Sequence, residues 1–324
     1  MTGRNDSHLT ATGPEETPLT RRRGDATGLR IMITGANAGI GFWSTLQLAR
    51  SGAEVIMACR NPEKGETAAQ AIRARVPHAR LHLVPLDVAS LNSVAQAVDE
   101  ISTRGPLDGL IANAGMVHTP RTRKESVDGL ELVAATNYFG HYALIAGLLP
   151  VLEEAPAARV VTLGSLSTLL VRARLEDPQL VKHYSPWRAY AQSKIMVQSF
   201  AFELDRRLRL SQSSTRALCA HPGYSISGRT QIIDGVNNPS PAKVLAGNLQ
   251  RPFSQGKSQG AWPIVRAVLD TDDVDDPGPV FYGPRGLVRG VPRRATPAAI
   301  TTDRWAANTI WNAAETATGI SFLG

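Results

Sequence analysis

Short apolar segments alternate with longer amphipathic segments over most of this chain. The short segments are nearly continuous in Val, Ile, Leu and Ala, which is typical of strands buried on both faces of a parallel sheet. The longer segments repeat their apolar residues at helical spacing, so they predict helices between the strands. The predicted strands are Leu29–Thr34, Ala53–Cys59, Arg80–Leu86, Leu107–Ala112, Arg159–Leu163 and Thr215–Ala220, with Val280–Tyr282 as a candidate seventh. The predicted helices are Gly39–Ser51, Glu63–Arg75, Val94–Ser102, Gly129–Leu149, Tyr190–Leu210 and Thr302–Thr318.

This order of elements predicts an α/β fold with a doubly wound parallel sheet of the Rossmann type, about seven strands covered by helices on both faces. Right-handed crossovers place the carboxyl ends of the strands along one edge, where the ligand crevice of such a sheet lies. Functional residues are therefore expected directly after strands. No linker divides the chain, so residues 29–324 are expected to form a single domain.

Three segments lie outside this alternation. Residues 1–28 are polar and lack the apolar core of a secretory signal, so we interpret them as a disordered leader. Residues 224–262 are rich in Gly, Ser and Asn and have weak periodicity, which favours irregular structure. Residues 284–324 form a C-terminal extension whose one expected helix packs on the domain.

Composition and charge narrow the function classes. No run of about 18 apolar residues occurs, so no transmembrane segment is expected. Two cysteines cannot build a disulfide framework, and a reducing cytoplasm fits them best. The net charge is +7, but the basic regions at residues 21–23 and 285–294 are offset by acidic neighbours or lack an aromatic ladder, so no nucleic-acid partner is expected. The aspartate-rich stretch at residues 270–276 lacks the Gly and distal Glu of a calcium loop, and no metal site is expected.

A glycine-rich turn follows the first predicted strand and leads into a helix. Its glycines are spaced G-x-x-x-G-x-G, not the commoner G-x-G-x-x-G. Glycines let the backbone turn sharply and approach a pyrophosphate, which then lies at the positive N-terminus of the helix. A purely structural turn is the alternative, but the position at the start of a βαβ unit favours nucleotide binding. The predicted binding residues of this turn are Gly35, Asn37, Ala38, Gly39, Ile40 and Gly41.

The end of the second predicted strand bears on the choice of nucleotide. An NAD site commonly has an Asp or Glu about twenty residues beyond the glycine turn, where it accepts a hydrogen bond from the ribose 2′-hydroxyl. This chain has Arg60 and Asn61 there. The planar guanidinium of an arginine suits a 2′-phosphate, so NADP(H) is predicted in preference to NAD(H). An ordinary surface arginine is the alternative.

A tyrosine and a lysine stand one helical turn apart, as Tyr190 and Lys194. A free tyrosine, with a pKa near 10, is a poor acid or base at neutral pH. A neighbouring ammonium and the positive ring of an oxidised nicotinamide favour the phenolate and lower that pKa. The phenol can then give a proton to an alkoxide or take one from an alcohol. Taken alone, the pair could equally be a solvated helix face.

Other polar residues stand where the predicted crevice requires them. Ser165 follows the fifth strand and places a hydroxyl where a carbonyl oxygen could be held, and Asn137 lies on the preceding helix. The remaining candidates are Asp87 and Val88 after the third strand, Asn113, Ala114 and Gly115 after the fourth, and Pro222 and Gly223 after the sixth.

With five motifs in this order, the sequence from about residue 29 to 223 resembles the short-chain dehydrogenase/reductase family in its single-domain branch. The resemblance implies that residues 29–324 bind a dinucleotide and carry the catalytic centre. It implies Tyr190 as general acid/base, with Lys194 lowering the pKa of its phenol and holding the nicotinamide ribose. Ser165 would orient the substrate oxygen, and Asn137 would position a water in a proton relay. The implied cofactor contacts are Asp87 and Val88 to adenine, Asn113, Ala114 and Gly115 along the fourth strand, and Pro222 and Gly223 beside the nicotinamide.

The spacing of two motifs narrows the resemblance. Ser165 and Tyr190 are 25 residues apart, about twice the spacing in much of the family. A similar insertion, with a Cys-Arg-Asn end to the second strand and an Ala-Tyr-x-x-Ser-Lys motif, occurs in the group that resembles retinol dehydrogenases and protochlorophyllide reductases. That resemblance implies a lipophilic substrate and NADP(H). The family resemblance also implies a lid at residues 224–262 and a homodimer or homotetramer.

The sequence therefore predicts an NADP(H)-dependent oxidoreductase of the cytoplasm. It would transfer a hydride between nicotinamide and a ketone, aldehyde or alcohol that is lipophilic. One alternative is a non-catalytic NADP-binding sensor on the same fold, which the presence of all four catalytic residues weakens. The other is a nucleotide-sugar epimerase or dehydratase, against which the glycine spacing argues.

Overall fold

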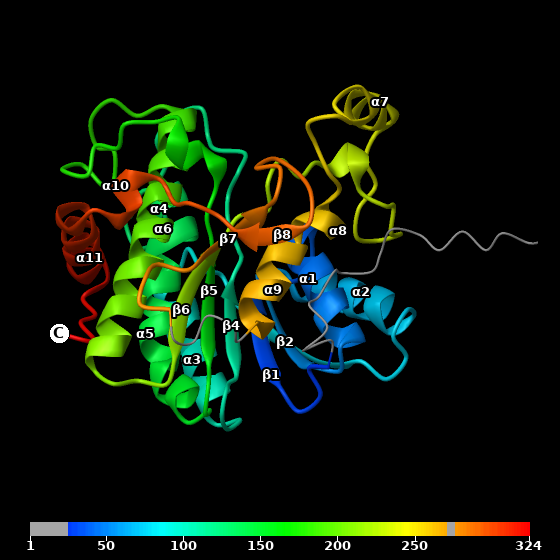
Figure 1. Cartoon of the computed structure of the whole chain (residues 1–324), viewed down its shortest axis with the longest axis horizontal. Coiled ribbons are helices and arrows are strands. Elements are labelled where there is room, and N and C mark those ends of the chain that lie inside the picture. The colour runs from blue at the N-terminus through cyan, green and yellow to red at the C-terminus, as the bar shows by residue number, and fades with distance from the viewer. Residues whose placement is uncertain (1–24, 271–275) are drawn as a thin grey trace, which may run out of the picture.

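The computed structural model describes residues 25–270 and 276–324. Its centre is one sheet of eight strands in the order β3-β2-β1-β4-β5-β6-β7-β8 (Figure 1). The pairs from β3 to β7 are parallel, which confirms the predicted doubly wound fold. Residues 1–24 of the expected leader and residues 271–275 of the aspartate-rich stretch lie outside the described residues.

The strands follow the predicted segments closely, with one addition. The expectation of about seven strands is corrected to eight, because β8 pairs antiparallel with β7 at the edge of the sheet. Two of its three residues are exposed arginines, so it carries no buried-strand pattern. The strands are β1 (Arg30–Thr34), β2 (Glu54–Cys59), β3 (Arg80–Pro85), β4 (Gly109–Ala112), β5 (Arg159–Leu163), β6 (Arg216–Ala220), β7 (Phe281–Pro284) and β8 (Pro292–Arg294). Because β1 pairs with β2 on one side and β4 on the other, the strand order reverses there, and a ligand crevice is expected at these carboxyl ends.

Helices cover both faces of the sheet and bury two separate apolar layers (Figure 1). Successive residues of β1 point to opposite faces, so Ile31 and Ile33 join one layer and Met32 joins the other. The first face carries α1 (Gly39–Arg50), α2 (Pro62–Arg73) and α9 (Trp262–Leu269). The second carries α3 (Leu91–Ser102), α5 (Gly140–Glu153), α6 (Pro186–Leu210) and α11 (Arg304–Thr318).

The helix expected at Gly129–Leu149 is shifted and irregular. It begins with α4 (Leu132–Ala134), passes through a π-helical segment at Ala135–Phe139 and continues as α5 to Glu153. Among the described residues, Leu132–Glu153 is the one helix long and apolar enough to cross a membrane. Its most apolar stretch is 78% buried inside the protein, so it has the burial of a core helix.

The helix that carries the Tyr and Lys motif starts one turn earlier than expected. α6 begins at Pro186, and the side chain of Ser185 caps it by accepting a hydrogen bond from the Arg188 backbone N–H. A serine followed by a proline is a regular helix start, because the proline has no N–H to leave unpaired. Tyr190 therefore lies within the regular helix and not at its frayed end.

The segments after β6 complete the molecule. The expected lid contains a short 3₁₀ turn (Ser227–Arg229), α7 (Pro241–Leu249) and α8 (Lys257–Gly260). The C-terminal extension contains β8, α10 (Ala299–Thr302) and α11. α11 packs on the second helix layer, where the Trp311 ring lies 5.5 Å from the rings of both Tyr142 and Phe200. The Tyr142 hydroxyl donates a hydrogen bond to the Ile320 carbonyl at 3.0 Å.

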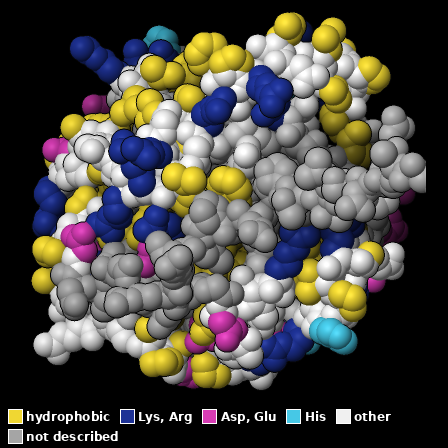
Figure 2. All heavy atoms as spheres, turned by 45° about the vertical axis from the view of Figure 1, so that its right-hand side comes forward, with side chains coloured by type: hydrophobic (Ala, Val, Ile, Leu, Met, Phe, Trp, Pro, Cys, Tyr) yellow, Lys and Arg dark blue, Asp and Glu magenta, His cyan; other side chains and the backbone are white. Residues whose placement is uncertain are grey.

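Large hydrophobic side chains are exposed on the segments that surround the carboxyl edge of the sheet. In the upper part of Figure 2, hydrophobic side chains lie beside Lys and Arg, with few Asp or Glu among them. Single exposed hydrophobics are ordinary, but a group of them marks a surface that meets other apolar material. The exposed residues of these segments include Leu169, Leu170, Trp187, Tyr224, Leu245, Leu249, Phe253 and Leu287.

Candidate active site

The glycine turn after β1 forms a tight cradle. Gly35 and Gly39 have φ of +66° and +59°, a region that side chains rarely adopt. A Cβ on Gly41 would lie 2.3 Å from the Gly35 carbonyl oxygen and 2.5 Å from Asn113 Nδ2, so α1 can approach the turn only with glycine there. The backbone is thus free to receive a pyrophosphate, and the cradle fits a dinucleotide cofactor.

Asn113, at the end of β4, ties that strand to the glycine turn. Its Nδ2 donates to the Thr34 carbonyl at 2.7 Å. The backbone N–H groups of Asn113 and Ala114 donate to Thr34 Oγ1 at 2.9 and 2.8 Å. The side chain of Asn113 is therefore a brace between β4 and the start of the cradle.

His141 continues this network in the core. Because Thr34 Oγ1 already accepts two N–H groups, its own hydroxyl hydrogen donates to His141 Nε2, at 2.9 Å. The other ring nitrogen then carries the hydrogen and donates to the Asn137 carbonyl at 3.2 Å. Burial lowers the pKa of His141 to about 4, which keeps the ring neutral. His141 is therefore a polar link between the cradle and Asn137.

Asn137 lies in the π-helical segment and faces α6. Its Oδ1 accepts from the Met116 backbone N–H at 2.7 Å, and its Nδ2 donates to Ser193 Oγ at 2.8 Å. The Ser193 hydroxyl donates in turn to the Tyr190 carbonyl at 2.7 Å. Asn137 therefore braces the turn of α6 that carries Tyr190. Its role in a proton relay stays a prediction.

Tyr190 and Ser165 meet across the gap between α6 and the end of β5. The Tyr190 hydroxyl donates to Ser165 Oγ at 3.2 Å. The Tyr190 ring also lies 6.3 Å from the ring of Trp187, one turn earlier on α6. Two hydroxyls that converge in this way can bind one substrate oxygen between them, and the phenol can exchange a proton with it.

Lys194 is buried below this pair. Its Nζ donates a hydrogen bond to the Leu163 carbonyl at 2.8 Å, and burial lowers the pKa of the ammonium to about 8. The predicted lowering of the Tyr190 pKa by Lys194 and an oxidised nicotinamide stays a prediction. Burial raises the pKa of the Tyr190 phenol, and the hydrogen bond with Ser165 opposes that shift. In this arrangement the phenol is held protonated at neutral pH, as a proton donor.

The remaining predicted cofactor residues follow the expected strand ends. Arg60 is exposed directly after β2, and its neighbour Asn61 caps α2 by accepting from the Lys64 backbone N–H at 2.8 Å. Asp87 and the buried Val88 follow β3, and the Asp87 carboxylate accepts from the Ala89 backbone N–H at 3.0 Å.

Three further predicted positions are set by close backbone contacts. Gly115 lies beside Asn137, since a Cβ there would come 3.3 Å from Asn137 Oδ1. Pro222 follows β6, and Gly223 has φ of +65° with the Val288 carbonyl oxygen only 2.3 Å from where its Cβ would be. Two pairs of predicted site residues lie together: Tyr190 is hydrogen-bonded to Ser165, and Gly41 packs against Asn113. Arg60 is exposed at the end of β2.

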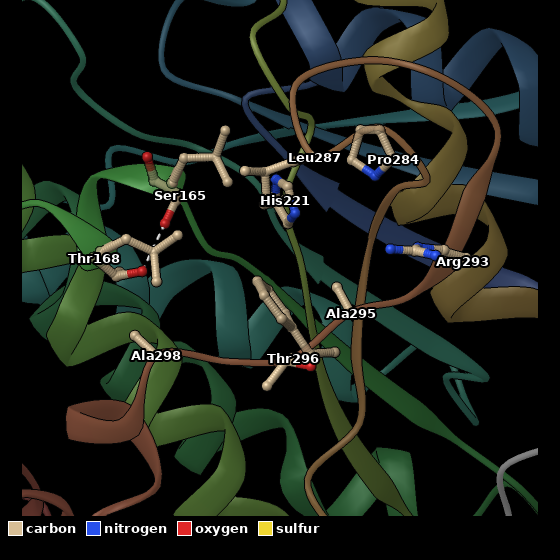
Figure 3. A pocket seen from close by; sticks show the side chains of 12 residues that line it. Ser165, Thr168, His221, Pro284, Leu287, Arg293, Ala295, Thr296 and Ala298 are labelled. Carbon is tan, nitrogen blue, oxygen red and sulfur yellow. Dashed lines mark hydrogen bonds between the residues drawn. The ribbon is translucent and has the colours of Figure 1, made fainter.

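A pocket of about 200 Å³ opens beside Ser165 (Figure 3). Ser165 and Thr168 border it on one side, and the C-terminal extension contributes Leu287 and Arg293 on the other. Sequence reasoning missed this contribution, because no local pattern marks residues 284–298 as neighbours of β5. The lining residues are Ser165, Leu166, Thr168, Leu169, His221, Phe281, Pro284, Leu287, Arg293, Ala295, Thr296 and Ala298.

Comparison with known proteins agrees with this geometry. The family model described as short chain dehydrogenase matches residues 30–233. This chain belongs to the short-chain dehydrogenase family. Members of this family are oxidoreductases that act on CH–OH and C=O groups with a nicotinamide cofactor.

The family members most similar in sequence include enzymes named for lipid alcohols. The chain is 34% identical to mouse retinol dehydrogenase 12 over 246 residues, which cover 76% of this chain and 74% of that protein. It is 37% identical to mouse polyprenol dehydrogenase over 218 residues, 63% of this chain and 64% of that protein. An uncharacterised protein of Mycobacterium paratuberculosis has a similar structure, with a TM-score of 0.74 and 34% identity over 92% of this chain and 96% of that one. The chain therefore falls in the retinol dehydrogenase-like group of short-chain dehydrogenases.

Proposed function

We propose that this short-chain dehydrogenase uses NADP(H) to interconvert a lipophilic carbonyl compound and its alcohol. One observation carries the proposal. The Tyr190 hydroxyl lies 3.2 Å from the hydroxyl of Ser165, and Ser165 lines a pocket with mostly apolar walls. The chain also provides a glycine cradle for a dinucleotide.

The residues of this site divide the chemistry between them. Ser165 holds the substrate oxygen by a hydrogen bond, and the Tyr190 hydroxyl donates its proton to that oxygen during reduction. In the oxidation of an alcohol, Tyr190 takes the proton back. When bound, the nicotinamide supplies the hydride in one direction and accepts it in the other. Asn137 and Ser193 keep the first turns of α6 in place, so the two hydroxyls stay converged.

Arg60 supports the choice of NADP(H). Its guanidinium is exposed at the carboxyl end of β2, and among the described residues no acidic side chain bonds to it. An anionic 2′-phosphate at this strand end would find a planar cation with several N–H donors. Arg60 stands where an NAD site commonly has an acidic residue, so it favours the 2′-phosphorylated ribose of NADP(H) over the 2′-hydroxyl of NAD(H).

The pocket walls support a lipophilic substrate. Leu166, Phe281 and Pro284 line the pocket, while Leu169 and Leu287 both line it and remain about half exposed. An apolar chain could extend from the two hydroxyls past these two leucines, which would remove their apolar surface from water. The names of the retinol and polyprenol dehydrogenases point in the same direction for this chain.

The test is a cofactor titration followed by a substrate series. We expect NADPH to quench tryptophan fluorescence at a Kd at least about tenfold below that of NADH, and we expect Arg60→Asp to remove that difference. With NADPH bound, a straight-chain aldehyde of ten carbons should be reduced with a higher kcat/KM than acetaldehyde. Equal affinity for both nucleotides in the wild type would contradict the NADP(H) assignment, and a preference for acetaldehyde would contradict the lipophilic substrate.

A further inference from the structure

α8 joins the expected lid to α1. The Lys257 backbone N–H, at its first residue, donates to Thr230 Oγ1 at 2.9 Å. From α1, Gln47 Nε2 donates to the Ser258 carbonyl at 2.8 Å. A Cβ on Gly260 would lie 2.8 Å from Ile40 Cδ1, so this glycine lets α8 approach the helix that follows the glycine turn. α8 thus lies beside α1 (Figure 1), and the Lys257 backbone is held in place at its first residue.

The side chain of Lys257 reaches over the middle glycine of the cradle. A Cβ on Gly39 would lie 3.6 Å from Lys257 Nζ and 3.9 Å from its Cδ. Both atoms that a Cβ added to Gly39 would have within 4 Å, outside its chain neighbours, thus belong to Lys257. The ammonium therefore borders the open side of the turn, on the side where Gly39 has no side chain.

The surroundings of this ammonium are unfavourable for a lone positive charge. Lys257 is partly buried, and no carboxylate forms an ion pair with it among residues 25–270 and 276–324. Burial and the neighbouring Lys243 lower the pKa of Lys257. α1 has no acidic residue in its first turn. A partly desolvated cation of this kind gains most from an anion that lies within a few ångströms.

We propose that Lys257 is a cofactor clamp that binds the pyrophosphate of the dinucleotide from the lid side, opposite the glycine backbone. The inference rests on the proposed function, since it places the pyrophosphate on the cradle. Lys257 and Arg60 then recognise different parts of one molecule. Arg60 contacts the 2′-phosphate, which only NADP(H) has, and Lys257 contacts the pyrophosphate, which NAD(H) and NADP(H) share.

The test measures the binding of both nucleotides by fluorescence, without turnover. For Lys257→Gln, we expect the Kd values of NADPH and NADH to rise by the same factor, about tenfold, because one charge-assisted contact is lost from each. We expect Lys257→Arg to keep most of the affinity. The dependence of Kd on ionic strength should weaken in Lys257→Gln and not in Lys124→Gln, which removes an exposed lysine from the segment before α4. Thermal unfolding of each variant verifies that it is folded.

The outcomes separate this inference from the proposed function. Unchanged Kd values in Lys257→Gln would overturn the clamp while leaving the cofactor site intact. A loss confined to NADPH would overturn the pyrophosphate assignment, because Lys257 would then be reading the 2′-phosphate. If the wild-type protein bound neither nucleotide, the dinucleotide site itself would be wrong, and the clamp would fall with it.

Discussion

The Tyr190 hydroxyl and the Ser165 hydroxyl form a hydrogen bond of 3.2 Å between two segments that are 25 residues apart in the sequence. Tyr190 is fixed from α6, where Ser193 and Asn137 hold the helix turn. Ser165 is fixed at the end of β5, where its own carbonyl accepts from the Thr168 hydroxyl at 2.9 Å. One hydroxyl is therefore held by α6, and the other belongs to the residue that caps the 3₁₀ turn Leu166–Leu169, two residues after β5.

Replacing Tyr190 with Phe should abolish proton transfer and leave cofactor binding intact. Without the phenol hydroxyl, the substrate oxygen loses its proton donor, so kcat should fall by a factor of about 100 to 10,000. The Kd for NADPH should change by less than about threefold. Initial rates with a ten-carbon aldehyde and fluorescence titration would measure both. Tyr184→Phe is the matched control, because the Tyr184 hydroxyl donates to the Pro120 carbonyl, away from Ser165. Equal rates for Tyr190→Phe and Tyr184→Phe would remove Tyr190 from the mechanism.

The sequence predicted the sheet well because its signals there are local. Five of the six predicted strands are buried and largely apolar, and β3 still has buried Leu81 and Val84. The glycine turn and the Tyr and Lys pair are short motifs formed by residues close in sequence. It did not predict the π-helical segment around Asn137, since one extra residue in a turn leaves the apolar pattern almost unchanged. α9 was missed for another reason. All its residues but Arg266 are buried, so no polar face reveals its period.

The features that the sequence could not predict come from contacts between distant segments. The pocket beside Ser165 is completed by Leu287 and Arg293, more than 100 residues further along the chain. The approach of Lys257 to Gly39 is of the same kind. Burial, which the sequence does not report, raises the pKa of the Tyr190 phenol.

A methyl group added to Gly41 should disable the cradle. In Gly41→Ala, the new Cβ would overlap the Gly35 carbonyl oxygen and Asn113 Nδ2, so the turn must move. We expect a loss of about 1 to 3 kcal/mol in the free energy of unfolding and a rise of at least tenfold in the Kd for NADPH. Chemical denaturation and fluorescence titration would measure these changes.

The control for Gly41→Ala is another helical glycine on the same face of the sheet. A Cβ on Gly65 of α2 would meet the Leu83 side chain at 3.0 Å, and that side chain can move. Gly65→Ala should therefore leave NADPH binding unchanged, with any steric cost offset by the better helix propensity of alanine. Tight NADPH binding by Gly41→Ala would show that the turn does not need its present shape.

His141 should make the protein less stable in mild acid. Its pKa is about 4 in the folded protein and near 6.5 when exposed, so the unfolded chain binds more protons between these values. The free energy of unfolding should therefore fall as the pH drops from 6.5 towards 4, by on the order of 3 kcal/mol from this residue. Urea unfolding at pH 7.5 and 5.0 would measure the loss. His141→Asn should reduce it, whereas His118→Asn, at an exposed position, should not. Identical pH dependence in the two variants would contradict the neutral, buried ring.

The buried ammonium of Lys194 should destabilise the folded protein at neutral pH. Burial lowers the pKa of its ammonium from 10.5 to about 8, so the unfolded chain binds more protons between pH 8 and 10.5. The contribution of Lys194 to stability therefore rises with pH across that window, and below pH 8 its charge is held at a cost on the order of 3 kcal/mol.

Lys194→Met removes the charge and also the hydrogen bond to Leu163, which is worth about 1 kcal/mol. At pH 7 the variant should thus be more stable than the wild type by about 2 kcal/mol, and the difference should shrink towards pH 10. Urea unfolding of both proteins at pH 7 and pH 10 would measure the difference in the free energy of unfolding. Their rates with NADPH and aldehyde would measure the loss of activity. A variant that is less stable than the wild type at pH 7 would mean that the buried ammonium is stabilised by its surroundings and is not a strained group kept for catalysis.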